Sequence, residues 1–306
     1  MWNEPIDRLE TALVELLWAQ WAEVTAAASS RRRGRSLIDP EALVLTSLAL
    51  RNRERRLWDM LGWCASETPR LLSVQRARNL VDAYPPPVRT ALGGFAQLAV
   101  EEGADHRWRT LQTTDPETPP RASKLGSEPV RLIEDSTMWL RLRLGLGVGV
   151  KADLLAFLIA CGGAAFSVRD MAGATGYTTN AIRRAADELG EARVVRVIKG
   201  YPVEYHVDGR AWLDLLEVTD APPWRYWHQV FSFATRVFAL RHALLQREAS
   251  RYVASSELRQ LSGKHAQLFA WNRITAPAID VHPGEEFLDE FGEAIGNLAG
   301  WVEAHS

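Results

Sequence analysis

One segment in the second half of the chain constrains the fold more than any other part of the sequence. It begins at Ser167 and reads SVRDMAGATGYTTNAIRRAADELGEARVVRVIKGYPVEYHV. Ser167 and Asp170 have the spacing of a capping box, which predicts the start of a helix. Gly176 stands where this helix must end, because glycine adopts the left-handed backbone conformation at little cost. Thr178 or Thr179 then caps another helix, so the segment predicts two short helices in close succession.

The second of these helices is amphipathic. Ile182, Ala186 and Leu189 share the face that is predicted to turn inward. Its outward positions are polar, namely Thr179, Asn180, Arg183, Arg184 and Asp187. The runs RVVRVI and VEYHV follow, joined through KGYP, and their β-branched residues predict a two-stranded hairpin.

A further helix is predicted just before this segment, in KADLLAFLIACGG, whose leucine and isoleucine side chains share one face. The order of helix, helix, turn, helix and two-strand ribbon resembles a winged helix-turn-helix domain. The resemblance is to small bacterial repressors, such as the arsenic-repressor-like and multiple-antibiotic-resistance-repressor-like groups. The stretch ATGYTTNAIRRAADEL carries most of the resemblance, and the resemblance as a whole covers about a fifth of the chain.

The resemblance implies a DNA-binding function. In that family the third helix enters the major groove, and the ribbon lies along the backbone or the minor groove. The corresponding helix here is at about 179–190 and the wing is at 194–207. The residues implied to face DNA are Thr178, Thr179, Asn180, Arg183, Arg184, Arg196 and Lys199. The chemistry agrees, because arginine binds guanine in bidentate fashion, asparagine binds adenine, and short hydroxyls bind phosphate.

The charge of the chain gives a mixed signal. Its formal net charge is −2, and residues 151–210 hold 8 Lys and Arg against 7 Asp and Glu. Asp187 and Glu188 would repel phosphate if they faced it. A strong DNA binder usually shows a clearer basic face. A winged helix that docks a protein partner instead therefore stays an alternative.

Arginine-rich runs near the N-terminus are a second source of positive charge. Residues 31–56 include RRRGR and RNRERR and hold 8 Lys and Arg against 3 Asp and Glu. Such runs suit phosphate contact, or they form a solvated loop and a solvated helix end, and both interpretations stay open. The stretch LLSVQRARNL is a candidate recognition helix with Gln75, Arg76 and Arg78 outward; a plain helical bundle is the competing interpretation.

Helical patterns dominate the rest of the chain, so the fold class is predicted as mostly α. Residues 1–110 predict a helical N-terminal domain, and the polar, proline-containing stretch 111–130 predicts a linker. Residues 131–210 hold the central winged helix-turn-helix with its two-stranded β-wing, and 211–306 form a helical C-terminal region for dimerisation or sensing. Aromatic residues crowd the start of the helix predicted at 224–250, which is the expected homodimer contact.

Motifs for enzymatic chemistry are weak. The glycines of GLGVGV lack the GxGxxG spacing, and no P-loop lysine follows them. The run DVHPGEEFLDEF contains Asp280, His282, Glu285 and Glu286, but one histidine amid acids at a helix start is typical of a solvated terminus. We expect no catalytic residue, no metal and no cofactor.

Cysteine use and hydropathy suggest a compartment. Cys64 and Cys161 are far apart and form no CxxC motif, which fits a reducing cytoplasm and argues against a disulfide framework. The N-terminus has no signal-peptide pattern, and no uncharged apolar run is long enough to span a membrane.

The sequence thus predicts a cytoplasmic, bacterial-type transcriptional regulator, for example a repressor, that binds double-stranded DNA as a homodimer. The alternative is a protein-interaction module, such as an antitoxin or a defence-system accessory factor, whose winged helix docks a partner protein.

Overall fold

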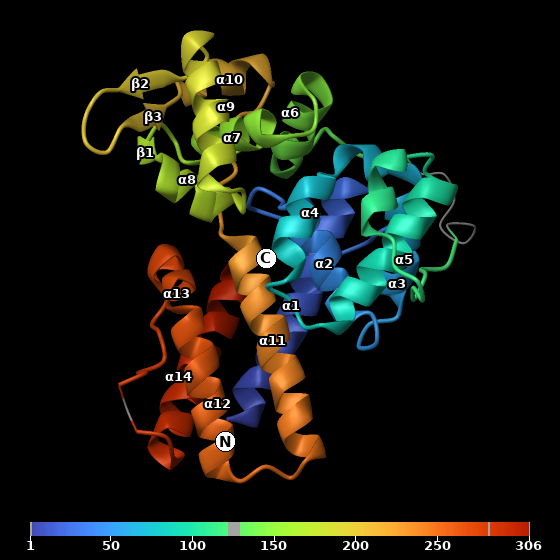
Figure 1. Ribbon diagram of the computed structural model, residues 1–306, viewed down its shortest axis with the longest axis vertical. Coiled ribbons are helices and arrows are strands. Elements are labelled where there is room, and N and C mark those ends of the chain that lie inside the picture. Colours follow the sequence, from blue (N-terminus) through green and yellow to red (C-terminus); the bar gives the residue numbers. More distant parts are fainter. Residues whose placement is uncertain (1, 122–128, 281, 306) are drawn as a thin grey trace.

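The computed structural model describes residues 2–121, 129–280 and 282–305. It is mostly helical, with one small antiparallel sheet, as Figure 1 shows. The prediction of a mostly α chain is confirmed. Residues 122–128 of the predicted linker lie outside the described part of the chain.

The N-terminal region contains five α-helices and two short 3₁₀ helices in its described part. Their bounds are α1 Asn3–Val24, α2 Pro40–Leu50, α3 Arg56–Glu67, η1 Pro69–Leu71, α4 Val74–Val81, α5 Pro87–Glu101 and η2 His106–Leu111. Local signals fix several of these starts. Asp39 caps α2 ahead of Pro40, and Ser73 caps α4 by accepting from the backbone N–H of Arg76.

The central region contains short helices and the sheet. Its elements are η4 Asp135–Thr137, α6 Met138–Leu146, α7 Val150–Ala160, β1 Phe166–Ser167, α8 Val168–Thr175, α9 Thr179–Glu191, β2 Arg196–Ile198, β3 Glu204–His206 and α10 Gly209–Leu215. The strands are ordered β1-β3-β2, with Val197 opposite Tyr205 and Phe166 on the other side of Tyr205. The sheet therefore has three strands rather than the predicted two, because the short β1 also pairs with β3.

The C-terminal region is helical and shares a core with the N-terminal region. Its helices are α11 Trp227–Gln246, α12 Arg251–Lys264, α13 Ala266–Asn272 and α14 Glu285–Ala304. α14 packs along α1, and one continuous cluster of buried apolar side chains combines α1–α5 with α11–α14. A second cluster lies within residues 138–226 and takes only Leu37 from elsewhere.

The aromatic residues of α11 are part of the first cluster. Trp227, Phe231 and Phe233 are fully buried. The Trp227 ring lies 5.1 Å from Phe231 and 5.3 Å from Trp301, and Phe233 lies 5.3 Å from Phe269 between ring centroids. These side chains build the chain's own core, so they give no exposed aromatic face for the dimer contact expected of this helix.

The described part of the 111–130 stretch packs on the N-terminal helices. Arg51 donates from Nε to Glu117 at 3.0 Å, and Val130 forms an isolated bridge with Thr25. In the described residues, no helix has both the length and the apolar content that crossing a bilayer requires.

Candidate nucleic-acid interface

All seven residues predicted to face DNA have exposed side chains. Thr178, Thr179, Asn180, Arg183 and Arg184 are gathered at the N-terminal half of α9, whereas Arg196 is on β2 and Lys199 is in the hairpin that follows it. The wing lies against the other end of α9, because a Cβ on Gly190 would come within 2.8 Å of a Val197 methyl group.

The exposed face of α9 follows from its buried one. Ile182, Ala186 and Leu189 are buried in the second core cluster, as the amphipathic pattern predicts, and α9 packs on α7 and α8. Residues on the opposite side of the helix must then project into solvent.

Local hydrogen bonds fix the start of α9. Ser167 and Asp170 form the predicted capping box at the start of α8. Gly176 ends α8 with φ +76°, and its N–H donates to the carbonyl of Ala172. Thr178 then caps α9, its hydroxyl accepting from the backbone N–H of Ala181. The turn therefore has the geometry that the sequence predicts.

The acidic residues of α9, Asp187, Glu188 and Glu191, are all in its second half, and the first two have partners. Asp187 accepts a hydrogen bond of 2.7 Å from the hydroxyl of Tyr205, which joins the helix to β3. Glu188 pairs with Lys151 at 2.7 Å, and that hydrogen bond and charge lower the pKa of its carboxyl. No acidic residue occurs between Thr178 and Ala186. The half of the helix that carries the predicted contacts is thus free of like charge toward phosphate.

The basic side chains of this surface are not neutralised within the chain. Among the described residues, none of Arg183, Arg184, Arg196 and Lys199 forms a salt bridge with a carboxylate. Each guanidinium or ammonium group is therefore available to an external anion.

A cluster of buried ionised side chains lies directly behind the α8–α9 turn. We call it the buried ion network, and its members are Asp39, Glu41, Arg76, Arg143 and Asp153. Arg143 donates to Glu41 at 2.6 and 2.9 Å and to Asp153 at 2.7 and 2.8 Å. Arg76 donates to Glu41 at 2.8 Å and to Asp39 at 2.7 Å. All five side chains are almost completely excluded from solvent.

The buried ion network joins the N-terminal helices to the turn before α9. Arg76 of α4 donates from Nε to the carbonyl of Thr175 at 2.6 Å. The hydroxyl of Tyr177 donates to Asp153 at 2.7 Å and lies 3.0 Å from the Ser73 hydroxyl. Burial alone would raise the pKa of the Asp39 carboxyl, but the charge and hydrogen bonds of Arg76 hold it below its ordinary value.

The prediction for the stretch LLSVQRARNL is wrong in one residue. Arg76 was expected to point outward, yet it is fully buried because it is the cation between Asp39 and Glu41. Gln75 and Arg78 are exposed, as predicted. α4 is thus a helix whose inner face holds a buried charge.

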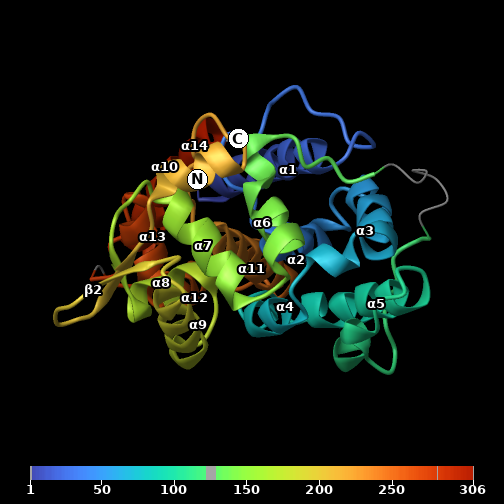
Figure 2. The same ribbon diagram turned by 90° about the horizontal axis from the view of Figure 1, so that it is seen from above.

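The N-terminal arginine clusters lie away from α9. Arg31, Arg32, Arg33 and Arg35 line a surface cavity of about 790 Å³ together with residues at the ends of α1 and α14. Figure 2 shows α1 and α14 on the opposite side of the molecule from α9. These arginines therefore add nothing to the face that α9 presents.

Several arginines of the second run, RNRERR, form salt bridges within the chain. Arg51 is buried and pairs with Glu117, and Arg56 pairs with Glu54 at 2.9 Å. This run is therefore a poor source of free positive charge.

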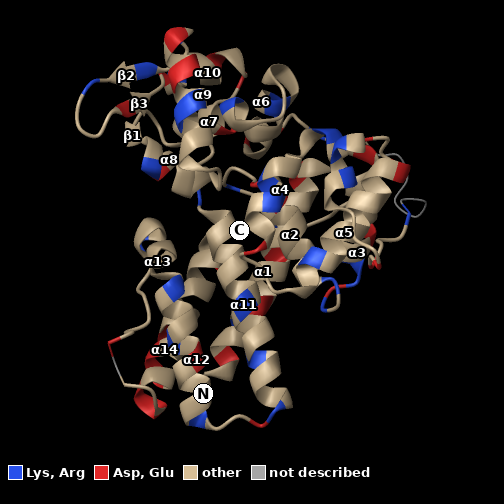
Figure 3. Ribbon diagram, in the orientation of Figure 1, with Lys and Arg blue, Asp and Glu red and all other residues tan. Residues whose placement is uncertain are grey.

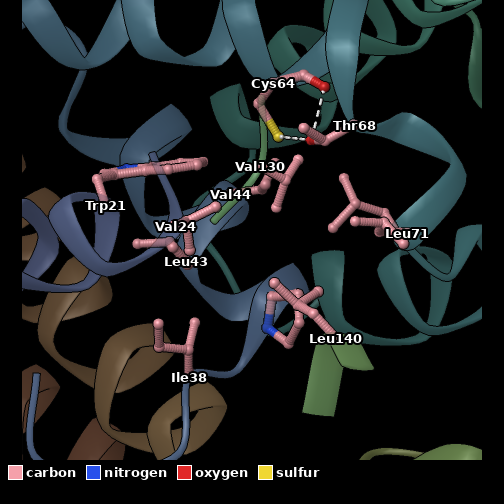
Figure 4. Close-up of a pocket in the computed structure, with 12 residues that line it drawn as sticks. Trp21, Val24, Ile38, Leu43, Val44, Cys64, Thr68, Leu71, Val130 and Leu140 are labelled. Carbon is pink, nitrogen blue, oxygen red and sulfur yellow. Dashed lines mark hydrogen bonds between the residues drawn. The ribbon is translucent and has the colours of Figure 1, made fainter. Parts of the chain in front are cut away.

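The structure shows a small enclosed cavity among α1, α2 and α3 (Figure 4). Its lining is apolar apart from Cys64 and Thr68, which contact each other at 3.1 Å. The cavity volume is about 20 Å³, which is room for roughly one water molecule and far too little for an effector.

The acidic run near residue 280 forms no metal cluster. In the described ranges, no three His, Cys, Asp or Glu side chains are grouped as metal ligands would be. Glu285 of that run instead pairs with Arg251.

None of the protein-family models, curated proteins and solved structures compared with the chain matches it. Functional inference therefore rests on the residues and on their arrangement.

Proposed function

We propose that this protein is a DNA-binding transcriptional regulator of the winged helix-turn-helix type, acting in the cytoplasm. α9 enters the major groove, and the hairpin of β2 and β3 lies along the backbone. One observation carries the proposal: the N-terminal half of α9 is exposed, free of acidic residues and rich in groups that bind bases and phosphates.

The residue chemistry assigns roles along the helix. Arg183 and Arg184 have the planar guanidinium groups that bind guanine in the major groove, and Asn180 has the amide that binds adenine. Thr178 and Thr179 stand at the helix N-terminus, where backbone N–H groups and hydroxyls bind phosphate. Arg196 and Lys199 then hold the backbone from the wing.

Homodimerisation is part of this proposal. Two copies of α9 would read two half-sites one helical turn apart, so that two modest affinities combine. Trp227, Phe231 and Phe233 of α11 are buried in the core, so the proposed dimer contact does not use these three side chains.

The test is binding to the DNA upstream of the coding gene, measured at several salt concentrations. Replacing Arg183 and Arg184 together by Ala should weaken binding by about 1–3 kcal/mol for each lost base contact. The matched control is Arg31→Ala with Arg33→Ala, which removes the same charge from the opposite side of the molecule. Equal affinities for the two double variants would contradict the proposal.

A protein-docking function is the second candidate, and the wing favours it. Val197 and Ile198 are each 45% exposed and Tyr201 is completely exposed, so the hairpin presents apolar side chains to solvent. An antitoxin or a defence-system accessory factor would use such a surface to hold its partner protein. In that case Ile198→Ser would abolish partner capture in pull-down, and Arg183→Ala would leave it intact.

A further inference from the structure

α4 lies in direct contact with the turn that leads into α9. Asn79 donates from Nδ2 to the carbonyl of Gly176 at 3.2 Å, and Arg76 donates to the carbonyl of Thr175. Leu80 packs so closely under the turn that a Cβ on Gly176 would come within 2.6 Å of its methyl group. α4 therefore touches the turn through both hydrogen bonds and apolar contact.

The outer face of α4 lies close to the turn that leads into α9. Gln75, Arg78 and Asn79 are exposed on α4, and Asn79 donates to the carbonyl of Gly176, two residues before the exposed Thr178. Figure 2 shows α4 and α9 along the same, lower edge of the molecule, and Figure 3 shows basic residues on both. The N-terminal region therefore also contributes positive charge, from α4, near the basic residues of α9.

Buried contacts fix the position of α4 relative to the turn before α9. The buried ion network connects α4 through Arg76 to the carbonyl before Gly176, and Tyr177 connects the same turn to Asp153. Buried charges that lost these partners would be strongly destabilised.

The guanidinium group of Arg78, on the exposed face of α4, has N–H donors that are not used within the chain. Its Nη2 donates to the Thr110 hydroxyl at 2.6 Å, which uses one of five N–H donors and orients the guanidinium. Among the described residues it forms no salt bridge, because Asp82, on the same outer ridge, pairs with Arg89 instead. The remaining donors face solvent.

We propose that the nucleic-acid surface extends from α9 onto α4, and that Arg78 binds the DNA phosphate backbone beside the groove that α9 enters. This inference rests on the proposed function. A helix seated in the major groove has a phosphate strand on either side, since the groove is about as wide as one helix. The wing contacts the C-terminal end of α9, and α4 stands at its N-terminal end, so the two elements flank the helix and reach the backbone at two separate places.

The experiment compares single variants that each remove one positive charge. Arg78→Ala, Arg183→Ala and Arg33→Ala are titrated with the upstream DNA and with a duplex of unrelated sequence, at several salt concentrations. A lost phosphate contact reduces the slope of log K against log salt by about 1 and weakens both duplexes alike. We expect this for Arg78→Ala, no change for Arg33→Ala, and a loss confined mainly to the upstream DNA for Arg183→Ala.

The outcomes separate the two proposals. If Arg183→Ala weakens binding while Arg78→Ala behaves like Arg33→Ala, the extension onto α4 is wrong and the proposed function stands. If neither Arg183→Ala nor Arg78→Ala changes binding, the proposed function fails as well.

Gln75→Glu gives a second readout, because it adds a negative charge to the exposed face of α4 without touching the Thr110 hydrogen bond. This variant should bind DNA more weakly. Unchanged binding would also overturn the inference. Thermal midpoints equal to that of the parent protein establish that each variant is folded.

Discussion

Tyr177 shows how a single side chain connects distant parts of the chain. It precedes the cap of α9, and its hydroxyl reaches Asp153 of α7 and Ser73 at the start of α4. Burial raises the pKa of this hydroxyl, so it remains a donor over the whole physiological pH range.

Tyr177→Phe should lower the free energy of unfolding by about 1–3 kcal/mol, because Asp153 loses one donor in a buried site. Arg143 still pairs with Asp153, which keeps the loss moderate. Urea denaturation measures the difference. Tyr201→Phe is the control, since Tyr201 is fully exposed and should show no change; a comparable loss in both variants would contradict the role given to Tyr177.

His228 makes the stability of the protein depend on pH. Burial lowers the pKa of its imidazole to about 4, against the attraction of Asp39, and the nearby Arg76 lowers it further. The ordinary value in an unfolded chain is about 6.5, so the unfolded state takes up a proton first as the pH falls. The stabilisation from neutral His228 is therefore complete above the unfolded-state pKa of about 6.5. It is lost as the pH falls from there toward 4.

We expect the free energy of unfolding to drop by about 3 kcal/mol through His228 between pH 7 and pH 4, the size that a shift of this extent implies. In His228→Gln the pH dependence should flatten in this range. His265, whose pKa is likewise lowered to about 4 by burial and by Arg236, contributes its own part, and His265→Gln measures it separately. Chemical denaturation at a series of pH values gives both slopes, and an unchanged slope in His228→Gln would refute this assignment.

At the scale of the elements, the sequence predicts α8 and α9 well because their boundaries are coded locally. Ser167, Gly176 and Thr178 cap or end a helix through hydrogen bonds to residues three or four positions away. The third strand could not be predicted in the same way. β1 has only two residues, and it exists because it pairs with β3, far along the chain.

Gly176→Ala should destabilise the protein by about 2–4 kcal/mol, because it combines a left-handed backbone with a close contact to Leu80. Gly145→Ala is the matched control. Gly145 lies inside α6 with no atom near its added methyl group, so alanine there should be neutral or stabilising by about 0.5–1 kcal/mol. Thermal denaturation distinguishes the two, and similar midpoints would show that the turn tolerates a side chain.

At the scale of the whole molecule, the joining of the first and last helices was not predictable from the sequence. The apolar stripe of α1 shows that this helix is covered, but the stripe does not identify the partner. The partner is α14, near the other end of the chain. The predicted division into N-terminal and C-terminal regions therefore describes the order of the sequence, while the apolar core is shared between them.

Phe291→Ala in α14 should cost about 3–5 kcal/mol, since its ring is fully buried in the shared core. Because that core is continuous, hydrogen exchange should accelerate in α1 and α2 as well as in α14. Acceleration restricted to α11–α14 would mean that the two regions unfold independently.

The buried ion network was also missed, although the sequence held a signal for it. Arg76 falls on the same helical face as Leu80, and Asp153 interrupts the apolar stretch of α7. A charge at an apolar position indicates either a buried partner or a wrong register, since charged residues are rarely buried alone. The partner of Arg143 is Glu41, 102 residues away, and only the folded chain reveals it.

The buried ion network crosses the predicted domain boundaries, so truncated fragments of the protein would separate its members. Cutting at residues 131 and 210 would yield a tidy-looking fragment, but Arg143 and Asp153 would leave while Glu41 and Arg76 stayed behind. Charged groups that are buried in the intact chain would then be exposed without their partners, and the members left in the N-terminal region, Asp39, Glu41 and Arg76, would hold two negative charges against one positive charge. α9 is therefore best studied in the uncut polypeptide.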